Sequence, residues 1–293
     1  MRFWLDTPLL AKPARAGFNE SGVSRNNRLI ERHESAYGAY WKSYDFKISD
    51  GRGNLFQFPL GPEFHGNPFN DQSFEHAGGE IIFNLPNRLQ GYLLVNNKDQ
   101  RIDEGPTDIV SDGNKVSGTT AVVNGISCMA CHKHGMIREG FRDEVRDGMG
   151  VSGTARTKVR RLYVKGADMA ALLKDDSDRF LDALDQAIGP FLKVGEAKDR
   201  NIRDFTDEPV AKIARLYNRD LTLADAAFEL GIADPKRLQS AIEDNDRLRQ
   251  LGLGTLAKGG LIKREAWASV KDRISPFQRA AFELDRGAPH LPF

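Results

Sequence analysis

The two cysteines of this chain lie three positions apart and are followed directly by a histidine. They belong to the stretch "NGISCMACHKHG", residues 124 to 135, as Cys128, Cys131 and His132. Two thiols about one helical turn apart can each add to a vinyl group of a haem, and the adjacent imidazole can bind the iron. The spacing therefore predicts one covalently attached haem c, with Cys128 and Cys131 as thioether residues and His132 as the proximal iron ligand.

Three other interpretations of the same residues stay open at this point. A thioredoxin-like redox pair usually begins a helix after a strand in a βαβ unit, and that pattern is not apparent here. A zinc site would need four ligands, which Cys128, Cys131, His134 and a distant histidine could supply, but a second pair of cysteines is missing. The third alternative is that both cysteines are structural.

The ligand on the far side of the iron decides the function of such a site. A sixth protein ligand favours electron transfer, whereas an open position permits the binding or activation of small oxidants. We favour His76 in "FEHAGGEIIF", because Gly78 and Gly79 would let the backbone pass close to a flat ligand. Glu80 could act with His76 as acid and base on a peroxide. Weaker candidates for this ligand or for the wall of the pocket are His33, His65, His134, Met136, Met149 and Met169.

The chain also resembles a family. The segments "GFNESGVSRNNRLIERHESAYGAYWKSYDF", "GRGNLFQFPLGP", "HAGGEIIFNLPNRLQGYLLVN", "RIDEGPTDIV" and "NGISCMACHKHGM" are similar to the C-terminal region of large bacterial proteins that carry a c-type cytochrome haem motif. The resemblance covers residues 16 to 146 well and the helical tail loosely. It implies an exported monohaem protein with Cys128, Cys131 and His132 as the haem residues, and it implies no specific reaction.

Patterning along the chain indicates which elements must position these residues. Residues 1 to 78 are rich in Gly, Asn, Pro and aromatic residues, which favours extended segments and loops. Short apolar runs at 81–85, 91–96 and 101–103 predict a small antiparallel meander, and the cysteine motif is expected to open a short helix.

The pattern becomes helical from about residue 155. Residues 168–189 have helical spacing with Gly189-Pro190 as a stop, and Pro209, Thr222 and Asp234-Pro235 mark helix starts. Residues 263–274 and 275–285 are two further helix candidates. We therefore expect an α+β fold, with a β-containing haem module at 1–155 and an all-helical domain at 156–293.

Composition limits the classes of partner. The 293 residues can bury a substantial core, and Lys plus Arg (42) balance Asp plus Glu (41), so no overall field attracts nucleic acid. No apolar run approaches the roughly 18 residues of a membrane span, and Asp6 and Pro8 interrupt a signal-peptide core. Haem attachment would then place this chain in the periplasm or another outer compartment, as a mature form or as part of a longer exported protein.

The N-terminal stretch up to His33 is locally basic. Some of its side chains could pair with the propionates of a buried haem, because a guanidinium suits bidentate carboxylate binding. The basic residues are Arg2, Lys12, Arg15, Arg25, Arg28 and Arg32.

A competing pattern lies in residues 221–242, where an alanine followed four positions later by Gly231 is typical of a helix-turn-helix. Glu243, Asp244 and Asp246 argue against phosphate contact. The sequence thus predicts a monohaem c-type cytochrome that transfers single electrons with a redox protein partner. The alternatives are a haem enzyme of peroxidase type or a small-ligand sensor with an open distal site, and a non-haem interaction or DNA-binding module.

Overall fold

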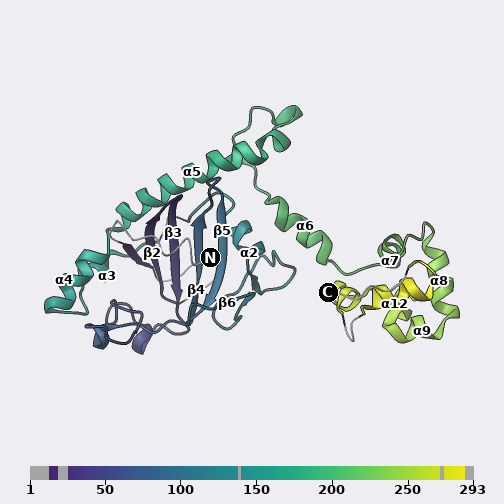
Figure 1. Cartoon of the computed structure of the whole chain (residues 1–293), viewed down its shortest axis with the longest axis horizontal. Coiled ribbons are helices and arrows are strands. Elements are labelled where there is room, and N and C mark those ends of the chain that lie inside the picture. Colours follow the sequence, from purple (N-terminus) through teal and green to yellow (C-terminus); the bar gives the residue numbers. More distant parts are fainter. Residues whose placement is uncertain (1–12, 19–25, 138–139, 271–273, 288–293) are drawn as a thin grey trace. The chain divides into compact units, whose positions relative to one another are not determined.

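The computed structural model describes residues 13–18, 26–137, 140–270 and 274–287. The chain divides into two compact units, up to Lys212 and from Ile213 onward. The boundary expected at 155/156 differs from this division, because the helices at 153–192 share the apolar cores of the sheet in the first unit. The α+β class itself is confirmed: the first unit holds an antiparallel sheet and the second is helical (Figure 1).

The first unit is organised around a six-stranded antiparallel sheet in the simple order β1 to β6. The meander expected at 81–103 is present as β4 to β6, and β1 to β3 extend it through segments that the sequence marked only as extended. The strands of this sheet are β1 (Ala14–Phe18), β2 (Arg28–Ser35), β3 (Gly38–Asp45), β4 (Gly78–Asn84), β5 (Gln90–Asn96) and β6 (Arg101–Ile102). A separate pair is formed by β7 (Glu104–Gly105) and β8 (Val122–Val123).

One face of the sheet is covered by the long helix α5 (Gly166–Leu192), which runs beside it in Figure 1. Side chains alternate between the faces of a strand, so the cross-strand pair Trp41 and Ile82 point the same way. Both are buried with Met169 and Leu173 of α5 in one core cluster. Apolar burial of this kind contributes roughly 1.5–3 kcal/mol per large side chain.

A buried ion pair joins the same helix to β2. The guanidinium of Arg32 donates from Nε and Nη2 to the two oxygens of Asp176, at 2.7 and 3.0 Å. Asp176 is completely buried and also accepts from Arg179 of its own helix at 2.6 Å. Both carboxylate oxygens are therefore paired, as a charge removed from water requires.

The opposite face packs against α4 (Gly153–Leu162) and the loops between β3 and β4. Leu29 and Tyr44 form a core there with Phe74 and Tyr163. Glu31 lies on this face as well, paired with Arg15 and with Nε2 of His33 at 2.6 Å.

The remaining helices of the described residues are mostly short. They are α2 (Ile126–Cys131), α3 (Asp143–Asp147), α6 (Pro209–Asn218), α7 (Leu223–Glu229), α8 (Pro235–Asp244), α9 (Asp246–Leu248), α10 (Gly254–Ala257), α11 (Arg264–Ala268) and α12 (Pro276–Glu283). Helix α6 begins in the first unit and ends in the second. None of the helices in the described part of the chain is long and apolar enough to cross a membrane.

Most helix starts lie where the sequence placed them, and one stop does not. Thr222 and Asp225 form a reciprocal cap on α7, and Asp234 caps α8 with Pro235 in its first turn. The stop expected at Gly189-Pro190 is wrong, since α5 continues to Leu192. A proline in the last turn removes only one N–H donor. Lys193 still donates to the carbonyl of Gly189 at 2.8 Å.

Replacing Asp176 with alanine tests the ion pair between β2 and α5. We expect Asp176→Ala to lower the free energy of unfolding of the first unit by about 3–5 kcal/mol, because Arg32 is then left buried and unpaired. Hydrogen exchange of the amides in β2 and β3 measures this loss. The control is Asp175→Ala on the exposed side of α5. It should change the same quantity by less than about 0.5 kcal/mol. Equal effects of the two variants would contradict this role.

Glu31 predicts how the first unit responds to acid. Burial alone would raise the pKa of Glu31, but Arg15 and His33 outweigh it and lower the pKa to about 2. The pKa of Glu31 in the folded protein lies below its ordinary value of 4.5. The ionised side chain therefore contributes its full stabilisation of the fold above about pH 4.5, and this contribution is lost as the pH falls towards 2. Glu31→Gln should be less stable at neutral pH and lose less stability between about pH 5 and 2, as unfolding curves across this range will measure. Glu34→Gln, on the same strand but exposed, should keep the wild-type pH profile.

Candidate functional site

The cysteine motif forms the short helix α2, as expected from the sequence. Gly125 precedes the helix with a φ of 83°. This conformation favours glycine, and the chain turns there from β8 into the helix. Asn124 ties this corner to the sheet by accepting from the amide of Leu94 at 3.0 Å, and Ser127 accepts from the amide of Val123 at 3.0 Å. The helix therefore stands in a fixed place against β5.

Both cysteines and the histidine of the motif line a single cavity of about 730 Å³, counting the space open to solvent. We call this the motif cavity. Its apolar wall is formed by Leu94, Val110, Val122 and Ile137. Its polar wall is formed by Arg28, Asp45, Glu80, Asp112, Asn114 and Ser127. A concave site that combines apolar walls with a few polar groups is typical of a site for a cofactor or another small molecule.

His132 ends α2 and is held at both of its ring nitrogens. Nδ1 lies 3.3 Å from the carbonyl of Gly135, and Nε2 lies 3.5 Å from Oε2 of Glu80. Gly135 has a φ of 90°, and a Cβ there would lie 2.6 Å from Ser177 of α5. The hydroxyl of Ser177 accepts from the amide of Met136 at 3.0 Å. The turn after the motif is thus fixed on α5, and it fixes the imidazole in turn.

Glu80 is a buried carboxylate in direct contact with the motif. Burial would raise its pKa, but His132, the Cys128 thiol and Arg28 together lower it to about 2. The carboxylate is consequently charged at neutral pH. It brings one negative charge to the cavity wall, beside the nitrogen that would bind iron.

The two thiols differ in exposure. Cys128 is 2% exposed and Cys131 is exposed. Burial and the charge of Glu80 raise the pKa of both thiols, so both are protonated at neutral pH in the free protein. One thiol therefore faces the interior of the cavity and the other lies at its rim.

These features fit a haem c held by Cys128, Cys131 and His132. The thiols lie one helical turn apart on the same cavity, and Nδ1–H donating to Gly135 would leave the lone pair of Nε2 for a metal. Glu80 and iron would compete for that nitrogen, because the Oε2 atom faces it. Arg28 also lines the cavity, while its guanidinium pairs with Asp45.

Other residues singled out from the sequence lie away from the motif cavity. The ring of His76 packs on Tyr44 at 5.0 Å and on Phe74, in the core of the opposite face of the sheet. Glu80 therefore meets His132 and not His76. Two other candidates, Met136 and Met169, are buried in the core between the sheet and α5.

The remaining candidates for a ligand or for the wall of the pocket also lie elsewhere. Met149 and His65 are exposed, and His33 is buried against Glu31 and Tyr40. His134 donates from Nε2 to the carbonyl of Phe205 at 3.0 Å. Arg15 pairs with Glu31 and Arg32 with Asp176, whereas Arg2, Lys12 and Arg25 lie outside the described residues.

The geometry bears on two of the three alternatives for the cysteines, and the alternative that both are structural stays open. Helix α2 follows a two-residue strand of an antiparallel pair, which differs from the βαβ setting of a thioredoxin-like motif. Among the described residues, no group of three or more His, Cys, Asp or Glu side chains is arranged to hold a metal ion such as zinc.

Sequence reasoning missed the residues that fix the motif from a distance. Ser177 and Gly135 carry no chemical signal of their own, and they meet, far apart in the chain, because α5 crosses the sheet. Glu80 was singled out from the sequence as a partner of His76. The register of β4 on β5 instead sets it opposite Leu94, and both residues line the motif cavity.

Comparisons with protein-family models, with curated proteins and with solved structures gave no match for this chain. What the site does is therefore inferred from its own geometry and chemistry.

The exposure of the two thiols predicts their reactivity. In the haem-free protein, the Cys128→Ser variant, which retains Cys131, should react with iodoacetamide at least about tenfold faster than the Cys131→Ser variant, because access limits the buried thiol. Mass spectrometry of the alkylated protein measures both rates. In guanidinium the two rates should become equal. Equal rates in the native state would show that Cys128 is not shielded.

Proposed function

We propose that the first unit is a monohaem c-type cytochrome module that transfers single electrons. The observation that carries this proposal is that Cys128, Cys131 and His132 all line one cavity, which also has an apolar wall. Covalent attachment needs two thiols that reach one macrocycle and an imidazole that reaches its metal. This arrangement supports the resemblance of the same residues to a haem motif.

A haem bound there would supply one-electron redox chemistry at its iron. The chain's own residues do the rest. Cys128 anchors inside the cavity and Cys131 at its rim, so one edge of a bound macrocycle would stay close to the surface. An edge near the surface is what exchange with a redox protein partner requires.

Two groups set the electrostatics of the proposed site. The backbone carbonyl of Gly135 orients His132 through Nδ1 and raises its basicity as a ligand. Glu80 lies beside His132, and an ionised carboxylate there would stabilise a more positive, oxidised centre and so lower the reduction potential. Attachment of haem at such a motif would place the protein in the periplasm or another outer compartment.

The polar wall of the cavity favours a second candidate function. Arg28, Glu80, Asp112 and Asn114 could receive a polar small molecule beside the haem. This is the setting of a haem enzyme of peroxidase type or of a small-ligand sensor with an exchangeable sixth position. A high-spin spectrum that shifts when cyanide is added would select this candidate.

Expression with an export signal and a haem-maturation system tests attachment directly. The wild-type chain should carry one haem with the pyridine haemochrome spectrum of two thioether bonds. Cys128→Ser and Cys131→Ser should each give the shifted spectrum of a single thioether, and His132→Ala should retain haem with altered iron ligation. A low-spin spectrum in both oxidation states supports the electron carrier.

The matched control is Asn114→Ala, which alters an exposed residue of the cavity wall and should leave the two-thioether spectrum in place. A wild-type chain that acquires no covalent haem while a known c-type cytochrome matures in the same cells would overturn the proposal.

A further inference from the structure

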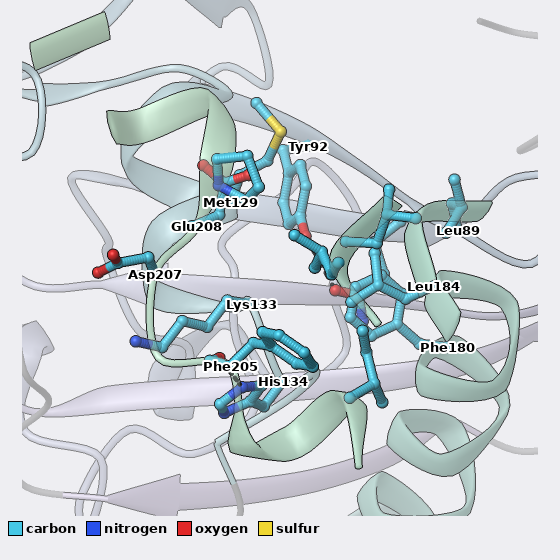
Figure 2. Close-up of a pocket in the computed structure, with 15 residues that line it drawn as sticks. Leu89, Tyr92, Met129, Lys133, His134, Phe180, Leu184, Phe205, Asp207 and Glu208 are labelled. Carbon is cyan, nitrogen blue, oxygen red and sulfur yellow. Dashed lines mark hydrogen bonds between the residues drawn. The ribbon is translucent and has the colours of Figure 1, made fainter. Parts of the chain in front are cut away.

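A second pocket lies on the other side of the cysteine helix. It holds about 630 Å³, counting the space open to solvent, and we call it the apolar pocket. Its floor is formed by Phe180, Leu184, Ile188 and Leu192 of α5, together with Ile202 and Phe205 of the segment that follows. Figure 2 shows Phe180, Leu184 and Phe205 on one side of the pocket and Tyr92 of β5 and Met129 of α2 on the other. The pocket has the lining of a small-molecule site, with mostly apolar and aromatic side chains and a few polar groups.

The apolar pocket and the motif cavity share the wall of α2 but use different faces of it. Met129 and Lys133 line the apolar pocket, whereas Cys128, Cys131 and His132 line the motif cavity. This follows from the helical period, because position 129 points about 100° away from position 128. A molecule in the apolar pocket would therefore contact a different face of α2 from the face that carries the haem residues.

Most polar groups at the rim of the apolar pocket already have partners. Lys133 donates to the carbonyl of Thr206, and His134 donates to that of Phe205. Glu208 caps α6 by accepting from the amides of Val210 and Ala211. Asp207 pairs with Lys212 at 3.2 Å. Because these polar groups already have partners within the protein, none of them requires a charged ligand.

Gln90 is the exception. Its side chain lines the apolar pocket and is 7% exposed, and its Oε1 atom accepts from the hydroxyl of Tyr92 at 3.0 Å. The Nε2 atom is buried and has no hydrogen-bond partner among the described residues. A buried N–H that stays unpaired costs free energy, so a donor of this kind in a pocket wall marks a place for an acceptor.

We propose that the apolar pocket binds a flat, apolar ring compound with a carbonyl oxygen, the chemistry of a quinone. The carbonyl accepts a hydrogen bond from Nε2 of Gln90, while the rings of Tyr92, Phe180 and Phe205 contact the apolar body. Among ligands, a hydrocarbon would leave Gln90 unpaired, and an anion would meet Asp207 and Glu208 at the rim. This inference goes beyond the haem proposal and does not depend on it.

Calorimetric titration of the haem-free full-length chain with 2,3-dimethyl-1,4-naphthoquinone tests the proposal. Both reactive ring positions of this quinone are substituted, which suppresses addition of the Cys131 thiol. The reference compound is 2,3-dimethylnaphthalene, which has the same ring system without carbonyl groups. We expect the quinone to bind with one-to-one stoichiometry and more tightly than the hydrocarbon.

Two variants separate the hydrogen bond from the pocket. Gln90→Leu removes the donor at similar volume and should weaken quinone binding by about three- to tenfold, the value of one neutral hydrogen bond. It should leave binding of the hydrocarbon unchanged or tighter. Leu184→Trp should fill the pocket and abolish binding of both compounds. Gln57→Leu makes the same exchange at an exposed position and should bind both like the wild type.

Absence of quinone binding to the wild-type chain would overturn the proposal, as would equal affinity of the wild type and Gln90→Leu for the quinone. Circular dichroism of each variant shows that its fold is retained, and Leu184→Trp tests the pocket even if Gln90→Leu is unstable. The titration uses protein without haem, so its outcome is separate from that of the haem-attachment experiment.

Discussion

The site depends on the register of β4 between β3 and β5. In this register Glu80 lies opposite Leu94 and Ile82 lies between Trp41 and Tyr92. Side chains alternate along a strand, so a slip of one residue would turn all of them to the other face. The face would then lose both the apolar contacts that hold α5 and the carboxylate that meets His132. One hydrogen-bonded alignment thus determines the core and the polar wall of the motif cavity together.

Charge on this face is buried in pairs. Arg28 pairs with Asp45 across β2 and β3, Arg32 pairs with Asp176 of α5, and Glu80 faces His132 at the end of α2. Each pair offsets part of the cost of removing its charges from water. The pairs also differ in their roles. The pair of Arg32 and Asp176 joins β2 to α5, whereas Glu80 contacts His132, the residue that we propose as the iron ligand.

The sequence predicted local features well and long-range ones poorly. The helix at the cysteine motif, β4 to β6 and the caps at Thr222 and Asp234 follow from short patterns, and the structure contains them. The pairing of β1 to β3 with that meander, and the return of α5 across the sheet, involve contacts between residues far apart in the chain. For the same reason His76, which was favoured as the distal ligand because Gly78 and Gly79 follow it, packs with Tyr44 and Phe74 instead. Neither Ser177 nor Gln90 stood out in the sequence.

Helix α2 (Ile126–Cys131) is only six residues long, and it borders two hollow spaces: Ser127, Cys128 and Cys131 line the motif cavity, and Met129 lines the apolar pocket. The hydrogen bonds of Asn124 and Ser127 hold this element in place, so an occupant that displaced it towards one space would have to break them. Molecules bound in the two sites would then influence each other through the helix. Thermodynamic linkage makes this influence reciprocal: if a molecule in one site changes the affinity of the other site by some factor, a molecule in the second site changes the affinity of the first by the same factor. A short helix shared by two sites would in this way couple them within a single domain, without the movement of a whole domain or subunit.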